Sequence, residues 1–294
     1  MGRLTRREMS DMAKLPTTTS SDDAAPEGAT DDDPEAREEK LPGAALLGCD
    51  LRVGFSFLTR LPVNLKPEDG ERKLADAAWT FPIVGIAVGV VTATALSVGF
   101  WLGLHPLACG LLAVAAGVFF TGAMHEDGFA DVADGFGGGA DKRAKLRIMR
   151  DSRIGTYGVL ALVLSVGLRA ALLAGMAGPG RATVALMAAA IASRAVLPLI
   201  MNVLKPARRD GLGADAGRPQ RADAVIAALI GSGLLLGLIE LEAAISVILA
   251  TAAAAFAVAS VARRQIGGFT GDVLGAVQQV AEITILAAVA SMRP

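Results

Sequence analysis

Long apolar runs separated by short polar connections dominate the chain after about residue 80. Seven of them reach or approach the roughly 20 residues that a helix needs to cross the hydrocarbon of a bilayer. Only His105 and Pro106 separate the first two runs, which forces an antiparallel hairpin, and Glu240 and Glu242 predict a turn in an otherwise overlong helix. The pattern predicts an all-α, polytopic transmembrane helical bundle of about seven spans. These are residues 81–104, 107–124, 157–178, 182–204, 225–239, 243–262 and 273–292.

Lysine and arginine fall mainly on one side of this predicted topology. The connections 125–156 and 205–224, together with Arg263 and Arg264, carry 13 basic residues, whereas the opposite side has 2. Because basic connections stay in the cytoplasm, the pattern predicts the N-terminus inside and the C-terminus outside. All the polar connections of interest then face the cytoplasm.

Composition agrees with a membrane protein and sets the beginning of the chain apart. The chain is 53% hydrophobic with a mean hydropathy of +0.50, which excludes an ordinary soluble domain. Residues 1–40 hold 6 basic and 11 acidic residues and few large apolar ones, so we expect a disordered acidic tail before a membrane domain at 41–294. Charges within 44–63 favour an interfacial or re-entrant helix there. Cys49 and Cys109 are expected to be buried small side chains.

Residues 121–158 concentrate the candidate chemistry. If the second span continues as a helix, Asp127, Asp131 and Asp134 occur at i, i+4 and i+7 and form one narrow acidic stripe. Oxygen ligands at this spacing suit Mg²⁺, which shares its coordination shell with substrate phosphates. The alternative is a solvated acidic helix end. We favour a metal-dependent phosphate site because small and apolar residues separate the aspartates.

Two features flank the acidic stripe. His125 is a candidate general base, or else a residue that orients a carboxylate or anchors the helix. After Asp134, the sequence GFGGGA predicts a loop at Gly137, Gly138 and Gly139 that lets a phosphate approach the backbone. This glycine run matches neither a Walker A motif nor a dinucleotide fingerprint.

Arginines recur after the glycine run. Arg147, Arg150 and Arg153 at i, i+3 and i+6 predict a comb that clamps a pyrophosphate, or alternatively a basic helix resting on anionic lipid. We assign the substrate role to Arg150, Asp151 and Arg153, and the lipid role to Lys142, Arg143 and Lys145.

Charges within the predicted spans are candidates for function because they are costly in lipid. Arg194 and Glu282 form either an interhelical ion pair or the floor of a polar cavity, and Arg169 is a third such charge. The connections 205–213 and 267–275 contribute Arg208 and Asp272 on the side of the acidic stripe.

Seven motifs extend over residues 50–294. They are HEDGFADVADGFGGG, RIMRDSRIGTYGVLALVL, FSFLTRLPV, FPIVGIAVG, SRAVLPLIM, PARRDGLG and GGFTGDVLGA. Together they resemble the cobalamin (5′-phosphate) synthase family, also called adenosylcobinamide-GDP ribazoletransferase. Glu126 departs from many members, which have an apolar residue there, so we expect it to be peripheral.

This resemblance implies an integral membrane transferase that depends on Mg²⁺. It would join adenosylcobinamide-GDP to α-ribazole, or its 5′-phosphate, and release GMP. The implied site lies on the cytoplasmic face of the cell (inner) membrane. We assign metal binding to Asp127, Asp131, Asp134 and Asp272, proton transfer to His125 or Asp134, and phosphate binding to Arg150, Asp151, Arg153, Arg208 and Gly137 to Gly139.

Partners and competing functions complete the prediction. The expected partners are the two substrates, the bilayer, other corrinoid-pathway enzymes and a second copy of the chain, but no nucleic acid. One alternative is a CDP-alcohol-type phosphotransferase, because Asp131-x-x-Asp134-Gly135 resembles part of its motif, although the rest of that motif is absent. An ion-coupled transporter is the other, but the chain has no internal repeat of the kind common in transporters.

Overall fold

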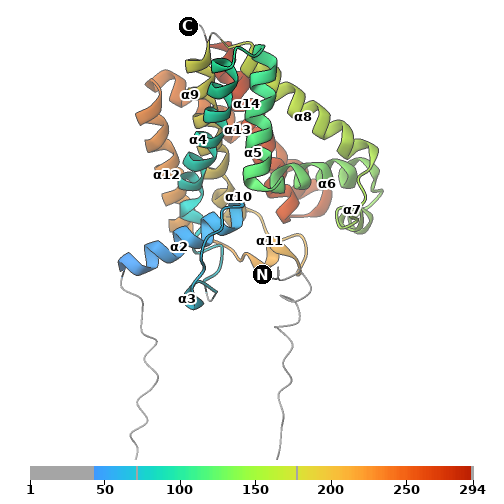
Figure 1. Ribbon diagram of the computed structural model, residues 1–294. Coiled ribbons are helices and arrows are strands. Elements are labelled where there is room, and N and C mark those ends of the chain that lie inside the picture. The colour runs from blue at the N-terminus through green and yellow to red at the C-terminus, as the bar shows by residue number, and fades with distance from the viewer. Residues whose placement is uncertain (1–42, 71, 177, 293–294) are drawn as a thin grey trace, which may run out of the picture. The chain divides into compact units, whose positions relative to one another are not determined.

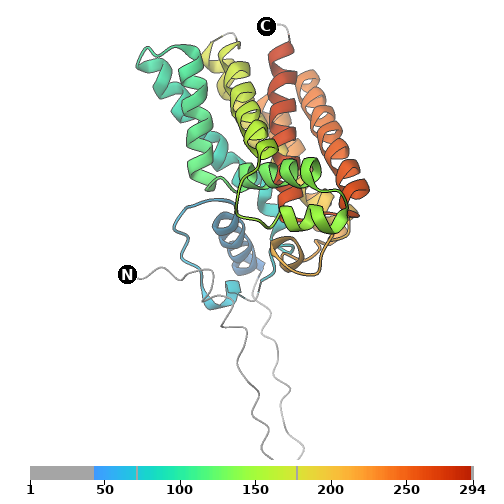
Figure 2. The same ribbon diagram turned by 90° about the vertical axis from the view of Figure 1, so that its right-hand side faces the viewer.

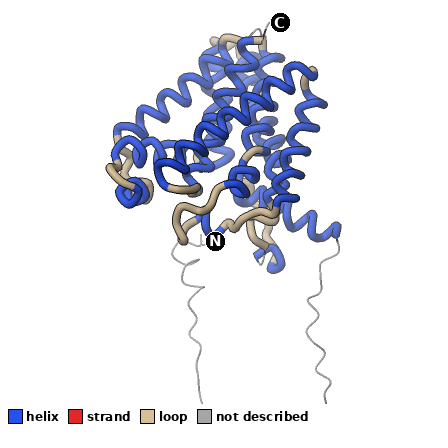
Figure 3. Tube along the Cα trace, turned by 180° about the vertical axis from the view of Figure 1, so that it is seen from behind, coloured by secondary structure: helices blue, strands red, loops and turns tan. Residues whose placement is uncertain are grey.

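The computed structural model describes residues 43–70, 72–176 and 178–292, so the predicted acidic tail lies outside the described residues. Helices build the whole described part of the unit that runs from Leu41 to Pro294 (Figure 3). Extended segments of that part meet only in an isolated parallel bridge between Pro206 and Phe269. The all-α prediction is therefore confirmed.

Six helical segments of the described chain are long and apolar enough to cross a membrane. Their ends match the predicted spans to within a few residues, and Figures 1 and 2 show them packed side by side. They are Ala78–Trp101 (η1, Ala78–Thr80, with α4, Phe81–Trp101), α8 (Thr156–Ala174), Pro179–Val203 (α9, Pro179–Ala195, with α10, Leu197–Val203), α12 (Arg221–Leu238), α13 (Leu241–Ile266) and α14 (Gly271–Ser291).

The expectation that the second span continues as a helix into the acidic stripe is wrong, and this changes the setting of the stripe. Helix α5 (Pro106–Thr121) stops early, and α6 (Met124–Gly138) begins after a bend of 94°. The reason is the backbone between them, because Gly122 (φ 70°) and Ala123 (φ 59°) are both left-handed and cannot continue a right-handed helix. We take α5, about 24 Å long, as a short seventh span. Helix α6 turns away from α5 across the bundle and is not among the six helices that qualify as spans by themselves (Figure 2).

Short helices build the end of the bundle at which α6 lies. They are α2 (Gly43–Leu58), α3 (Pro67–Gly70), α7 (Lys142–Ile148) and α11 (Leu212–Asp215). Helix α2 is not among the span-length helices. It is tied to the following segment by Asp50, which accepts from Arg72 at 2.7 Å and from the indole of Trp79 at 2.8 Å. Cys49 and Cys109 are buried and free, as expected.

Helix α9 lies at the centre of the bundle because its small side chains let neighbours approach closely. On α4, a Cβ at Gly85 would lie only 2.6 Å from the carbonyl oxygen of Ala190. Close contacts of this kind hold helices together where lipid removes the hydrophobic driving force. The alanines of α9 with at most 4% exposure are Ala182, Ala185, Ala188, Ala189, Ala190 and Ala192.

The bend between α5 and α6 gives a first prediction. In Gly122→Ala the new Cβ would be strained by the left-handed backbone and would collide with the Arg60 guanidinium, so we expect a loss of about 1–2 kcal/mol of stability. Thermal unfolding in detergent measures this loss. Gly167→Ala is the control, because its Cβ meets no atom within 4 Å in the middle of α8. Gly167→Ala is expected to gain about 0.5–1 kcal/mol of stability. Equal stability of the two variants would contradict the predicted backbone strain at residue 122.

Candidate functional site

The crossing of α6 and α14 brings the acidic residues of distant segments together. At Gly128 the two backbones touch, since a Cβ there would lie 2.8 Å from the Asp272 Cα. At Gly275 a Cβ would lie 3.0 Å from the carbonyl oxygen of His125. Asp127 is exposed beside this crossing, and Asp131 follows one helical turn later, half-buried.

Electrostatics confirm that these carboxylates are neighbours. The pKa of Asp131 is raised from 3.8 to about 7, mainly by burial and in addition by the negative charges of Asp272, Asp127 and Asp134. Among the described residues, no group of three or more His, Cys, Asp or Glu side chains is arranged so that it could hold a metal ion by itself. Mg²⁺ needs fewer protein ligands, because it retains several waters and binds through one or two carboxylates together with substrate phosphates.

A second crossing of segments brings Arg208 to the same place. Lys205 to Ala207 pair with Phe269, whose N–H donates to Lys205 O at 2.9 Å and whose carbonyl accepts from Ala207 N at 2.8 Å. This pairing leads into Arg208, whose Nη2 lies 3.7 Å from Asp272 Oδ2. The other terminal nitrogen, Nη1, is buried without a partner in the described chain. Arg208 therefore retains a donor for a further acceptor.

The predicted arginine comb does not form. Helix α7 ends at Ile148, so Arg150 and Arg153 lie in the following loop instead of one turn apart on a helix. Arg150 pairs with Asp210 of the connection that carries Arg208. Arg153 is 88% exposed and pairs with Asp151 at 2.6 Å. This bonding from Arg153 lowers the pKa of Asp151 to about 2.

Asp134 has a different position from the other two aspartates of the stripe. It is buried, and its Oδ2 and Oδ1 accept the N–H groups of Gly155 at 2.6 Å and Gly158 at 2.8 Å. These N–H groups belong to the free first turn of α8, which a carboxylate satisfies well. In this structure Asp134 thus caps α8 with both oxygens, instead of presenting them beside Asp127.

The glycine run is not a loop, contrary to prediction. Helix α6 continues through Gly137 to Gly138, and Gly139 is its C-cap. A Cβ at Gly137 would lie 2.7 Å from the ring of Tyr157, and a Cβ at Gly139 would lie 2.7 Å from the backbone nitrogen of Lys145. Close packing against α7 and α8 therefore explains these two glycines, and neither forms an open phosphate cradle.

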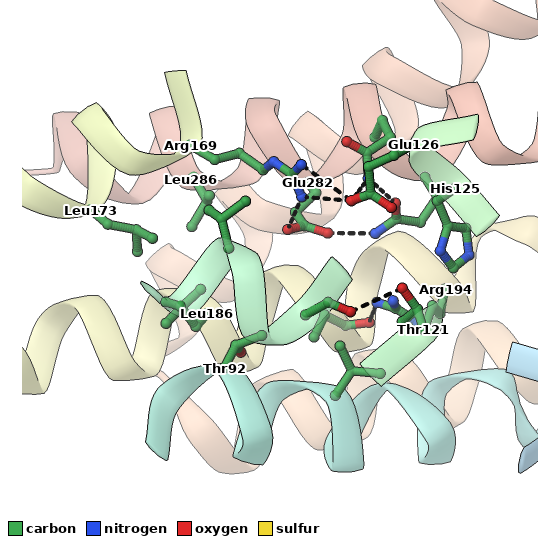
Figure 4. A pocket seen from close by; sticks show the side chains of 17 residues that line it. Thr92, Thr121, His125, Glu126, Arg169, Leu173, Leu186, Arg194, Glu282 and Leu286 are labelled. Carbon is green, nitrogen blue, oxygen red and sulfur yellow. Dashed lines mark hydrogen bonds and ion pairs between the residues drawn. The ribbon is translucent and has the colours of Figure 1, made fainter. Parts of the chain in front are cut away.

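His125 is also not beside the acidic stripe. Two residues on a helix are about 200° of rotation apart, so His125 projects from the face of α6 opposite to Asp127. It is 3% exposed and lines an interior cavity with Arg169, Arg194 and Glu282 (Figure 4). The position of His125 could have been predicted from the sequence, because the helical spacing that aligns the aspartates also places His125 on the opposite face.

The interior face of α6 joins a buried polar network that sequence reasoning described only in part. Arg169 contacts Glu126 and Glu282, each at 3.2 Å (Figure 4). Arg194 bonds the carbonyl of Ala190 at 3.1 Å, so the Arg194–Glu282 ion pair predicted as one alternative is not what forms. The enclosed volume is about 20 Å³, space for one water. Glu126, expected to be peripheral, is 7% exposed and central to this network.

The fold and site define a polytopic helical membrane protein with an acidic and basic cluster at one end of its bundle. Residues 50–290 match the family described as cobalamin-5-phosphate synthase. The chain belongs to this family, and it is a membrane transferase of cobalamin biosynthesis.

Similar proteins span nearly the same length. A protein of Bradyrhizobium diazoefficiens named adenosylcobinamide-GDP ribazoletransferase is 46% identical over 245 residues, which cover 83% of this chain and 94% of that protein. A protein of the same name from Azorhizobium caulinodans is 45% identical over 81% of this chain and 93% of its own length. No solved structure matches the chain.

Substitution of Asp134 distinguishes its capping contacts from metal binding. Asp134→Ala leaves the N–H groups of Gly155 and Gly158 without their acceptor, and we expect a loss of about 2 kcal/mol. Asp134→Asn retains one acceptor oxygen, so its loss should be smaller. Thermal unfolding of the metal-free protein in detergent measures both. Wild-type stability of Asp134→Ala would contradict the capping role.

Proposed function

We propose that the chain joins adenosylcobinamide-GDP to α-ribazole, or its 5′-phosphate, and releases GMP in a reaction that needs Mg²⁺. The observation that carries this proposal is the crossing of α6 and α14, where Asp127, Asp131 and Asp272 lie beside Arg208. A pyrophosphate substrate requires this combination of cation ligands and phosphate donors. The similar proteins bear the name of this activity.

The carboxylates of Asp127, Asp131 and Asp272 are the proposed Mg²⁺ ligands. Burial and the negative charges of its neighbours together raise the pKa of Asp131, and both effects favour a bound cation beside these carboxylates. When bound, Mg²⁺ neutralises charge on the pyrophosphate and on the departing GMP. Asp134 supports the site indirectly by holding the first turn of α8 against α6.

Arginines of two connections are the proposed phosphate ligands. Arg208 has an unpartnered buried Nη1 within the described chain and lies beside Asp272. Arg150 pairs with Asp210 across the neighbouring loops, and a phosphate would replace that carboxylate. Asp151 and Arg153 pair with each other farther out, where they can contact the parts of the substrates that extend into water.

The proposed reaction breaks a phosphoanhydride bond and forms a phosphodiester. A ribose hydroxyl of α-ribazole attacks the phosphorus on the cobinamide side, forming a P–O bond, and the bond from that phosphorus to the oxygen of the GMP phosphate breaks. The hydroxyl proton passes to a carboxylate of the acidic cluster, which consists of Asp127, Asp131 and Asp272. We prefer this acceptor to His125, because the imidazole lies on the opposite face of α6.

The proposed location is the cell (inner) membrane with the site in the cytoplasm. The excess of basic residues in the connections around the site supports this orientation. The bilayer and the two substrates are the proposed partners, and pathway enzymes or a second copy of the chain are further candidates. Topology mapping with reporters fused after residue 292 tests the orientation.

An assay in liposomes tests the activity. We expect GMP release only when adenosylcobinamide-GDP, α-ribazole and Mg²⁺ are all present, and chelation should abolish it. Omission of each component is the control. Alcohol transfer from a CDP-activated lipid without transfer from any corrinoid would instead support a CDP-alcohol-type phosphotransferase.

Asp127→Asn should lower transfer at least ~10³-fold, because an amide replaces a charged metal ligand. The variant should insert and unfold like the wild type, since Asp127 is exposed. GMP release and thermal unfolding are measured together. Asp223→Asn, which changes an aspartate in the first turn of α12, is the matched control. Near-normal transfer by Asp127→Asn would rule out the metal assignment.

The pKa of Asp131, about 7, gives a pH prediction. Below pH 7 this carboxyl is protonated and must lose its proton to bind Mg²⁺, so affinity for the metal should rise with pH and then level off. The half-activating Mg²⁺ concentration should fall up to ~10-fold per pH unit below 7. Initial rates across a range of Mg²⁺ concentrations at several pH values measure it. A constant half-activating concentration would contradict the prediction.

A further inference from the structure

The interior network around Arg169 has no part in the proposed reaction, yet it joins the helices that form the site. The Arg169 side chain is 4% exposed and lies between the carboxylates of Glu126 and Glu282 (Figure 4). Charges inside a membrane bundle are costly, and a well-packed apolar cluster is often at least as stable. A contribution to the stability of the fold therefore does not by itself explain why these charged residues are buried here.

One oxygen of Glu126 connects three helices. Both Nη1 and Nη2 of Arg169, on α8, donate to Glu126 Oε1 at 3.2 Å. Gln279 of α14 donates to the same oxygen at 3.0 Å. The amide oxygen of Gln279 accepts from Ser165 of α8 at 2.8 Å, so α6, α8 and α14 are joined at one point.

The same two helices, α6 and α14, carry the acidic cluster. Glu126 directly precedes Asp127 on α6, and Gln279 is seven residues after Asp272, on the same face of α14. The pair Glu126–Gln279 thus adds a polar contact to the backbone contacts at Gly128 with Asp272 and at Gly275 with His125. The backbone contacts set how closely the helices approach, and the polar contact fixes the rotation of α6 on α14.

We propose that Glu126 is a positioning residue: its bonds to Arg169 and Gln279 hold α6 in the rotation that sets Asp127 and Asp131 opposite Asp272. Without the charge at Glu126, α6 keeps the Gly128 contact but can rotate about it. The aspartates then share a cation less well. This inference rests on the proposed function, because it assigns the three aspartates to the metal.

Glu126→Gln tests the proposal, since it keeps the size and one acceptor oxygen but removes the charge. In the metal-free protein in detergent, hydrogen exchange of residues 124–138 should become at least ~5-fold faster. The kcat should fall at least ~10-fold, because a small misplacement of reacting groups is costly. The KM for adenosylcobinamide-GDP should change less than ~2-fold, since the phosphate-binding arginines are untouched.

Two further variants keep the test decisive. Glu242→Gln changes an exposed glutamate in the first turn of α13 and should behave as wild type in all three measurements. Glu126→Gln with Arg169→Gln removes one negative and one positive charge together, so the charges of Glu282 and Arg194 still balance in the cavity and the double variant should insert even if the single variant does not. We expect its kcat to remain low, because neutral amides hold α6 less firmly.

The outcomes separate the inference from the proposed function. Wild-type kcat and wild-type exchange in Glu126→Gln, or wild-type kcat in the double variant, would overturn the positioning role. Asp127→Asn is assayed in parallel. If Glu126→Gln behaves as wild type and Asp127→Asn is inactive, the positioning role falls and the metal assignment stands. If Asp127→Asn is fully active, the metal assignment fails. If the wild-type protein itself releases no GMP, the proposed function fails.

Discussion

Gly128 has no side chain, and this allows α6 to lie with its backbone against that of Asp272. The acidic site depends on this contact, because the aspartates come from segments about 140 residues apart. A methyl group at Gly128 would lie 2.8 Å from the Asp272 Cα, so the two helices would have to move apart. The left-handed backbone at Gly122 and Ala123 is the second requirement, since it turns α6 across the bundle and towards α14.

The two faces of α6 serve different environments. One face presents Asp127 and Asp131 on the solvent side of the helix beside Arg208, where water or a ligand can compensate their charges. The other carries His125 and Glu126 into the bundle, where each charge needs a fixed partner because water is scarce. A short helix of 15 residues thereby separates a site open to ligands from a closed network.

Basic residues around the site have carboxylate partners in two different environments. Arg150 is paired with Asp210 at the exposed surface, where an ion pair contributes little stability. Arg208 and Asp272 are mostly buried, and their separation of 3.7 Å leaves Arg208 Nη1 without a partner in the described chain. In the proposed function a phosphate, which carries more charge and more acceptors than a carboxylate, would bind the same arginines.

The sequence alone determined the membrane class, the approximate spans and the family, because apolar length and local motifs depend on neighbouring residues only. It also gave the acidic stripe, since helical spacing is local. Only the tertiary structure decided that Asp134 caps α8, that Gly137 packs on Tyr157, and that Glu126 meets Arg169. These outcomes depend on which helices touch. That contact is fixed by the bend after α5 and by the close crossing at Gly128, which no local pattern specifies.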